Sequence, residues 1–243
     1  MKLAMAQMRM SADYTDNIKK SKGLIEQAKG CDLVFFPEVQ LSPFFAQYRI
    51  AELPYGIDGY VTDIDGDEIA LFQRLAKENS LFISPNLYVN DGGKRYDMSL
   101  MIDGNGVILG QSKMVNVDNN KNFYEADYYT PSEEGYRVYD TPFGKVGIVI
   151  CYDRHFPESV RYCAAHKADL VIIPTANTFE EDMQYFEQEI QTLAKDNAVT
   201  IAMCNRVGTE NKMRFAGQSL IVSSNGETLL KADGREQLII FEI

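Results

Sequence analysis

Cys151 follows an apolar stretch and precedes polar and charged residues in the segment GIVICYDRHFPE, residues 147–158. A thiol attacks as the thiolate, so a catalytic cysteine needs a base or a positive charge nearby, and donors for the oxyanion that forms. In α/β folds the carboxyl edge of a sheet supplies such a place. Otherwise, a cysteine that ends a strand is a small buried hydrophobe. The residues available to activate Cys151 decide between these interpretations.

Two other segments place candidate partners at the same edge. Glu38, in VFFPEVQLSP (34–43), follows an apolar strand and a proline, and Lys113, in LGQSKMVN (109–116), ends the second arm of a hairpin. A carboxylate can serve as the base and an ammonium as an oxyanion donor. Each also has an ordinary interpretation, Glu38 as a solvated loop acid and Lys113 as a residue that caps a strand.

A cysteine–histidine site is the alternative arrangement. The chain has two histidines, His155 and His166. His166 falls in a predicted helix, and His155 is four residues from the thiol, where it could at most line the pocket. We therefore favour a carboxylate as the base.

The sequence contains an internal repeat, which predicts the secondary-structure elements that position these residues. Three pairs of similar segments recur in the same order, and the last pair shares an Asn-Gly hairpin turn. The pairs are CDLVFFP (31–37) with ADLVIIP (168–174), NSLFISPNLY (79–88) with NAVTIAMCNR (197–206), and SLMIDGNGVILG (99–110) with SLIVSSNGETLL (219–230). Each half is thus predicted as strand, helix, strand, loop, helix, strand and hairpin, opening with KLAMAQM in the first half and KVGIVIC in the second.

The spacing of apolar residues at i, i+3 and i+4 predicts two helices in each half. They cover residues 16–29, 67–79, 156–166 and 182–197. Two similar mixed sheets, each with helices on one face, can bury their bare faces against each other. The prediction is an α/β fold, a four-layer α-β-β-α sandwich with an internal pseudo-two-fold repeat, in a single domain of residues 1–243.

Composition limits the partners. The net charge of −11 is spread evenly, which argues against a nucleic-acid surface. No apolar run reaches the ~18 residues of a membrane span, and the first residues lack a signal-peptide apolar region. We expect a cytoplasmic protein whose partners are small molecules or copies of itself. The cysteines have irregular spacing, so we expect free thiols and neither a metal site nor a disulfide framework.

The motifs FPE at Glu38, SKM at Lys113 and ICYDRHFPE at Cys151 resemble the Glu-Lys-Cys triad of the nitrilase, or carbon-nitrogen hydrolase, superfamily. The resemblance runs from MAQ near the N-terminus to NRVG and FAGQSLIVSSNG near the C-terminus. It implies the same sandwich fold, no metal or organic cofactor, and a dimer or larger homo-oligomer. It also implies a second functional glutamate, matched by Glu125 in FYEADYYTPSEEG.

The resemblance implies a mechanism. Glu38 would take the proton of Cys151, and the sulfur would attack a carbonyl carbon. The Lys113 ammonium and the backbone N–H of Tyr152 would hold the oxyanion. Ammonia would leave a thioester that Glu38 hydrolyses through water, while Glu125 positions the substrate nitrogen or Lys113.

The residues after the cysteine bear on the substrate. Arg154 stands where N-carbamoyl-D-amino acid amidohydrolases bind a carboxylate, and Asn177 and Thr178 match a pocket Asn-Thr pair of those enzymes. His155 departs from them, because a second arginine is expected there. The alternative is that Arg154 is a scaffold residue paired with an acid of its own segment, either Asp153 or Glu158.

The stretch CNRVGTENKMRFAGQSLIV (204–222) is similar to N-carbamoylputrescine amidases, whose substrate is an amine. Nitrilases commonly have tryptophan beside the cysteine, whereas this chain has Tyr152 there and no tryptophan. We therefore favour an N-carbamoyl amine or N-carbamoyl amino acid amidohydrolase. The alternatives are an ω-amidase or other small aliphatic amidase and, from another class, a catalytically silent binding subunit.

Overall fold

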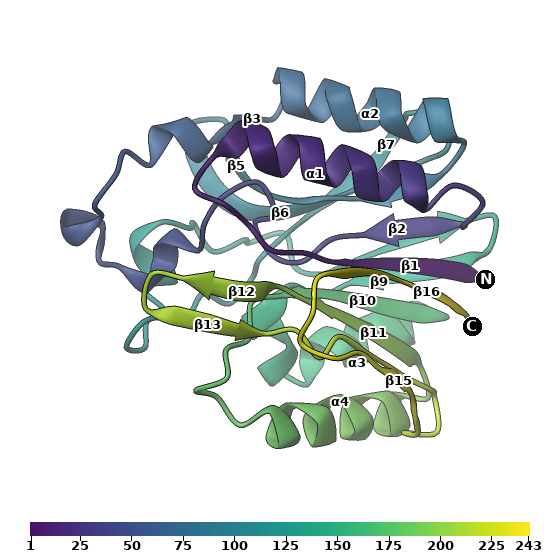
Figure 1. Cartoon of the computed structure of the whole chain (residues 1–243). Helices are drawn as coiled ribbons and strands as arrows, with labels where there is room; N and C mark the ends of the chain where they lie inside the picture. Colours follow the sequence, from purple (N-terminus) through teal and green to yellow (C-terminus); the bar gives the residue numbers. More distant parts are fainter.

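The computed structural model describes all 243 residues and shows the four-layer sandwich. Two α-helices cover the outer face of each of two stacked sheets (Figure 1). The first pair is α1 (Tyr14–Gln27) and α2 (Asp67–Asn79), and the second is α3 (Glu158–Ala165) and α4 (Met183–Asn197). Short 3-10 turns are η1 (Phe45–Gln47), η2 (Ile50–Glu52), η3 (Asp58–Tyr60), η4 (Glu125–Asp127) and η5 (Cys151–His155). The predicted fold class is confirmed.

The first sheet has the strand order β16-β1-β2-β4-β6-β5-β3, with β7 also paired to β6. Its strands are β1 (Lys2–Gln7), β2 (Leu33–Phe35), β3 (Thr62–Asp63), β4 (Phe82–Ser84), β5 (Asn86–Asp91), β6 (Lys94–Ile102), β7 (Ile108–Lys113) and β16 (Gln237–Glu242). The last strand of the chain thus completes the edge beside the first, with Lys2 opposite Glu242.

The second sheet has the order β15-β14-β11-β10-β9-β8. Its strands are β8 (Arg137–Thr141), β9 (Gly144–Ile148), β10 (Leu170–Thr175), β11 (Thr200–Asn205), β14 (Leu220–Val222) and β15 (Thr228–Lys231), and a separate hairpin consists of β12 (Val207–Glu210) and β13 (Met213–Ala216).

The two sheets repeat one pattern of pairing. The series β1-β2-β4-β6-β7 corresponds to β9-β10-β11-β14-β15. In both series the first two pairings are parallel and the next two antiparallel. The internal repeat predicted from similar segments is therefore present in the topology.

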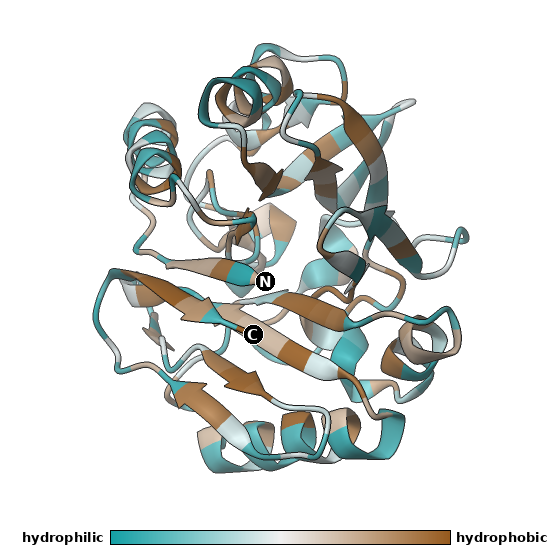
Figure 2. Ribbon diagram, turned by 90° about the vertical axis from the view of Figure 1, so that its right-hand side faces the viewer, coloured by the Kyte–Doolittle hydropathy of each residue, from teal (hydrophilic) through white to brown (hydrophobic).

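Three apolar cores hold the layers together. One of 27 buried residues lies between the sheets, and one of 23 and one of 14 lie between each sheet and its helices. Each helix contributes one face: α4 buries Phe186, Ile190, Leu193 and Ala194. Figure 2 shows the hydrophobic colour concentrated on the strands and the hydrophilic colour on the outer sides of the helices. The sandwich thus follows from the burial of one-sided elements.

Two details differ from the prediction. The segment 79–88 forms two strands, β4 and β5, separated by Pro85, which has no N–H to give to a ladder. Strand β9 ends at Ile148, so Cys151 begins the turn η5 and does not end the strand. None of the four α-helices has the length and apolar character needed to cross a membrane.

Candidate active site

Cys151 stands at the start of η5 with a backbone φ of +37°. Non-glycine residues seldom adopt positive φ, and such strain is concentrated at functional sites. The Cys151 Sγ lies 3.2 Å from the Thr175 Oγ1 at the end of β10, and 3.7 Å from the Arg154 Nη1. The thiol therefore lies beyond the carboxyl ends of the parallel strands β9 and β10.

The turn after the cysteine is anchored from outside. The Asp153 carboxylate accepts hydrogen bonds from the backbone N–H groups of Val115 and Asn116, at 3.1 and 2.8 Å. These bonds tie η5 to the segment that follows β7. As the second residue of a short helical turn, Tyr152 has no carbonyl within the turn for its N–H to bind, because the first N–H groups of a helix are orphaned. That N–H is available as an oxyanion donor.

Glu38 lies just after β2 and is completely buried. The next residue, Val39, has a φ of +41° and donates its N–H to the Asn86 Oδ1 at 2.5 Å. Neither carboxylate oxygen of Glu38 has an ordinary hydrogen-bond donor as its partner. Burial, followed by the charge of Glu125, raises the pKa of Glu38, while the proximity of the Cys151 thiol lowers it.

The thiol itself is held neutral. Burial, followed by the charge of Glu38, raises the pKa of Cys151 well above its ordinary value. The Arg154 guanidinium lowers the same pKa, but less strongly. A thiol in this environment reacts only if a neighbouring group takes its proton, and Glu38 lies within hydrogen-bonding reach.

Glu125 is the first residue of η4 and is 1% exposed. Its Oε2 accepts the backbone N–H of Asp118 at 2.8 Å, and its Oε1 makes no hydrogen bond within the chain. Burial raises the pKa of Glu125 to about 8. The side chain lines the same cavity as Cys151, so the two predicted residues do share a site.

The structure does not bring Lys113 to the thiol. Its ammonium donates to the Asp91 Oδ2 at 2.8 Å and to the Glu134 Oε1 at 3.0 Å, and lies 4.5 Å from the centre of the Tyr96 ring. Burial lowers the pKa of Lys113, but the bonds to Asp91 and Glu134 outweigh it and raise that pKa. Lys113 is thus a structural cation on another face of the sheet.

Strand alternation explains this placement. Lys113 lies opposite Met98, which belongs to the core between the first sheet and its helices. The next residue, Met114, belongs instead to the core between the sheets, together with Cys151. Because successive side chains point to opposite faces, the residue of this segment that faces the thiol's layer is a methionine.

The cavity at Cys151 has a volume of about 220 Å³ and is rich in acids. Its walls come from η4, η5 and the segments before and within α4. They are Asp118, Phe123, Glu125, Cys151, Tyr152, Arg154, His155, Asn177, Glu181 and Phe186. Three carboxyl groups therefore face one guanidinium across a small space.

Arg154 is 1% exposed, and both Nη atoms of its guanidinium are hydrogen-bonded. Its Nη1 donates to the carbonyl oxygen of Cys151 at 2.9 Å and to the Thr175 Oγ1 at 3.2 Å, and its Nη2 donates to the Asn177 Oδ1 at 2.9 Å. Its Nε lies 3.3 Å from the Glu189 Oε2. The acid paired with Arg154 is thus Glu189 of α4, and neither Asp153 nor Glu158.

The remaining predicted residues divide between two places. Asn177 lines the cavity and accepts from Arg154, whereas Thr178 bonds the Glu181 Oε2 and faces a different hollow. His155 lines the cavity and contacts the Glu189 Oε1 at 2.6 Å. His166 is exposed at the end of α3, so a site based on that histidine is excluded.

The model of the carbon-nitrogen hydrolase family matches residues 2–243. The protein belongs to this family. Among curated relatives, it is 25% identical to a citrullinase of Francisella tularensis over 96% of this chain and 84% of that one. It is 26% identical to an N-carbamoylputrescine amidase of Arabidopsis thaliana (96% and 83%) and 29% identical to an omega-amidase of Xenopus laevis (100% and 88%). The chain is thus a member of a family of amide-hydrolysing enzymes.

Solved structures share the fold of this carbon-nitrogen hydrolase. A carbon-nitrogen hydrolase from Helicobacter pylori superposes with a TM-score of 0.90 at 24% identity, covering 99% of this chain and 88% of that one. An amidase from Nesterenkonia superposes with a TM-score of 0.86 at 22% identity, covering 100% and 90%. A cysteine-to-alanine variant of that amidase was solved in complex with butyramide.

Sequence reasoning missed several residues of this carbon-nitrogen hydrolase site. Asp118 and Glu181 line the cavity, Asn86 and Arg206 hold the Glu38 loop, and Asp97 is buried near Glu38. Each lies on an element that only the fold brings to the cysteine. The one local signal was DNNKNFYEADYY (118–129), a cluster of acids and amides around Glu125.

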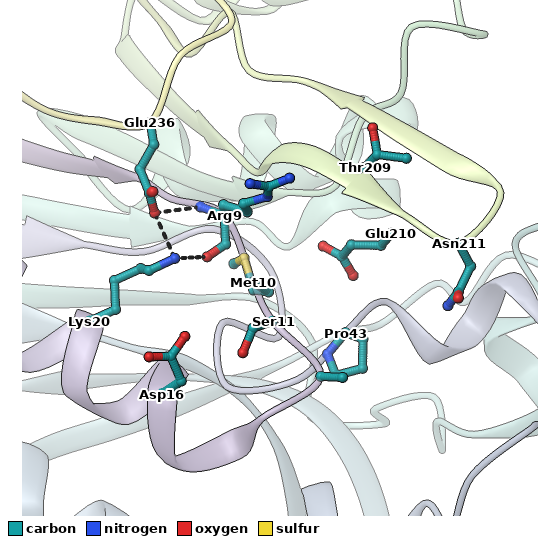
Figure 3. A pocket seen from close by; sticks show the side chains of 11 residues that line it. Arg9, Met10, Ser11, Asp16, Lys20, Pro43, Thr209, Glu210, Asn211 and Glu236 are labelled. Carbon is teal, nitrogen blue, oxygen red and sulfur yellow. Dashed lines mark hydrogen bonds and ion pairs between the residues drawn. The ribbon is translucent and has the colours of Figure 1, made fainter.

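The largest hollow of this hydrolase is elsewhere. It has a volume of about 490 Å³ and lies between the start of α1, the segment after β1 and the β12–β13 hairpin. Figure 3 shows Lys20 bridging the Glu236 carboxylate and the carbonyl oxygen of Arg9 at its rim. No cysteine or histidine lines it.

Proposed function

We propose that the protein hydrolyses an N-carbamoyl amine with Cys151 as the nucleophile and Glu38 as its base. Glu38 takes the Sγ proton, and the sulfur attacks the carbamoyl carbon. The Tyr152 N–H holds the oxyanion, and Arg154 is the cation that contacts the sulfur. Ammonia leaves first, and water activated by Glu38 then releases carbon dioxide and the free amine. This assignment differs from the triad expectation in leaving Lys113 outside the chemistry.

The observation that carries the choice of an amine is the charge of the cavity. Glu181 and Asp118 each have one carboxylate oxygen without a hydrogen bond, while both Nη atoms of Arg154 already donate and its Nε lies beside the Glu189 carboxylate. A cationic substrate tail therefore finds acceptors, whereas a carboxylate would compete with the acceptors that Arg154 already has and would face the acids of the wall. N-carbamoyl amino acids and ω-amides, which carry a carboxylate, are the weaker fits.

The test is to measure ammonia and carbon dioxide released from N-carbamoylputrescine, N-carbamoyl amino acids and ω-amides. We expect equal release of both from the cationic N-carbamoyl amine, and none from the Cys151→Ala variant. Cys31→Ala, which alters a thiol on the far side of the first sheet, is the control. Ammonia without carbon dioxide would reassign the protein as an amidase of simple amides.

A catalytically silent binding subunit is the second candidate, and the position of Lys113 is the observation that favours it. The expected triad then lacks its cation, and the cavity would bind an amide without cleaving it. Release of neither product from any of these substrates, together with a ligand-induced rise in Tm, would support this candidate.

A further inference from the structure

Asp97, in the middle of β6, is buried beside Glu38. Both side chains are 0% exposed. The Oδ1 of Asp97 accepts the amide N–H of Asn86 at 2.7 Å, whereas its Oδ2 and both oxygens of Glu38 have no ordinary donor as a partner. Buried polar oxygens are rarely left unsatisfied. The free oxygens of the two carboxyl groups can satisfy each other if one of them carries a proton.

No cation forms an ion pair with the carboxyl oxygens of Glu38 or Asp97. Lys113 is bonded to Asp91 and Glu134 on another face of the sheet. Arg206 contacts only the backbone oxygen of Glu38, at 3.4 Å, and forms its ion pair with Glu210 at 2.8 Å. Two buried like charges without a counter-ion are costly, so such a pair retains a proton.

The hydrogen bonding indicates where that proton is held. Burial is the main reason why the pKa values of both Glu38 and Asp97 are raised. Glu38 must be ionised to take the proton of Cys151, so the retained proton is assigned to Asp97. The Oδ1 of Asp97 accepts from Asn86, so the proton belongs on its Oδ2.

We propose that Asp97 is a positioning residue that acts in its protonated form, donating a hydrogen bond from Oδ2 to the Glu38 carboxylate and holding it toward Cys151. The inference rests on the proposed role of Glu38 as the base. When the thiol reacts, its proton passes to Glu38, the sulfur electron pair forms the bond to the carbonyl carbon, the π pair of the C=O bond moves to the oxygen, and Asp97 keeps its own proton. One negative charge thus moves from the Glu38 carboxylate to the substrate oxygen, and no second one is created.

Other titratable or charged groups that face Glu38 and Asp97 come from η4, from η5 and from the connection between β11 and β12. They are Glu125 of η4, Tyr129 after it, Cys151 and Asp153 of η5, and Arg206 between β11 and β12. Most of these groups are acids, and they reinforce retention of the proton.

The experiment compares Asp97→Asn with Asp97→Ala. An asparagine can accept from Asn86 through its oxygen and donate to Glu38 through its amide, as a protonated aspartate does. An alanine removes the donor. The readout is the rate at which iodoacetamide alkylates Cys151, followed by mass spectrometry, because it requires no knowledge of the substrate.

We expect Asp97→Asn to alkylate within about threefold of the wild type and Asp97→Ala to be slower by about tenfold or more, as for loss of general-base assistance. If Asp97→Asn were as slow as Asp97→Ala, the ionised carboxylate would be the working form and the proposal would fail. Unchanged alkylation in Asp97→Ala would also overturn it.

Ser99→Ala is the matched control, because the Ser99 Oγ accepts from the same Asn86 amide at 3.0 Å, two residues along β6. A loss in Ser99→Ala equal to that in Asp97→Ala would show a merely structural effect. Should Asp97→Ala fail to fold, the rate of Asp97→Asn decides. A rate within about threefold of the wild type retains the proposal, and a loss of about tenfold or more overturns it.

Alkylation and turnover also separate this inference from the proposed function. If Asp97→Asn alkylates normally and Asp97→Ala slowly, but no amide is hydrolysed, the inference about Asp97 is retained and the proposed function is rejected. If an N-carbamoyl amine is hydrolysed but the two variants alkylate at equal rates, the proposed function is retained and the inference is rejected.

Discussion

At the scale of single residues, the site is a neutral thiol among acids. Cys151, Glu38 and Glu125 come together as expected, and burial raises the pKa values of all three. The unexpected feature is the shortage of positive charge. Arg154 is the one cation in contact with the sulfur, and its nitrogens also hold the turn.

The position of Lys113 leads to a direct prediction. Lys113→Ala should leave kcat/KM within about threefold, whereas loss of an oxyanion donor would cost on the order of a hundredfold or more. The variant should instead lose about 1–2 kcal/mol of unfolding free energy, because two ion-pair hydrogen bonds disappear. Kinetics and urea denaturation of the same preparation separate the outcomes, and a hundredfold loss of kcat/KM at unchanged stability would restore the lysine to the mechanism.

The acid lining of the cavity predicts selectivity. Glu181→Gln should raise KM for a cationic N-carbamoyl amine by about tenfold, equivalent to about 1.4 kcal/mol, with little change in kcat. Glu180→Gln, which alters the exposed neighbour outside this cavity, is the control. Equal KM values for Glu181→Gln and the wild type would remove Glu181 from substrate recognition.

At the scale of elements, the sequence predicted the layers better than the site. Helix α2 covers the predicted residues 67–79, and the three pairs of similar segments correspond to equivalent strands. Apolar periodicity carries this information because it reports which face is buried. The motif at Lys113 failed for the same physical reason. Successive side chains of β7 point to opposite faces of the sheet, so a shift of one residue decides whether Lys113 or Met114 faces the thiol. The motif does not reveal which of the two does.

The residues that the sequence could not suggest act across elements. Asp97 and Glu38 lie on β6 and just after β2, and Arg206 reaches Glu38 from the second half of the chain. Nothing local marks an aspartate in a strand as a partner of a distant glutamate. Such pairs follow only from the register and the layer packing.

The turn η4 gives a prediction about pH and stability. Burial raises the pKa of Glu125 from 4.5 to about 8, so between these values the folded protein holds a proton that the unfolded chain has released. Stability from this group is full below pH 4.5 and is lost as the pH rises to about 8. Urea denaturation at pH 5 and pH 8 should show a smaller decline in Glu125→Gln than in the wild type, and an identical decline would contradict this.

At the scale of the whole molecule, the two outer helical layers differ. The layer of α3 and α4 exposes two large aromatic side chains, Tyr162 at 38% and Tyr185 at 56%, whereas neither α1 nor α2 carries an exposed large hydrophobic residue. Exposed aromatic groups are typical of protein interfaces. This layer is therefore the face through which we expect the homodimer to form.

Light scattering tests that expectation. The wild type should have the mass of a dimer or of a larger assembly, and Tyr185→Glu should shift it toward the monomer by placing a charge in an apolar contact. Arg74→Glu, a charge change on the exposed face of α2, should leave the mass unaltered. A monomeric wild type, or a dimer insensitive to Tyr185→Glu, would refute this choice of face.

The pairing of β16 with β1 sets an order of events during synthesis. Strand β1 (Lys2–Gln7) is synthesised more than 200 residues before its antiparallel neighbour β16 (Gln237–Glu242). Until then, β1 has one open edge, and nascent chains with open edges can pair with one another. The Glu38 loop also gains its contact with Arg206 only after the second half of the fold has been synthesised. Completion of the site thus depends on segments of the second half, and the first half alone carries an unpaired strand edge.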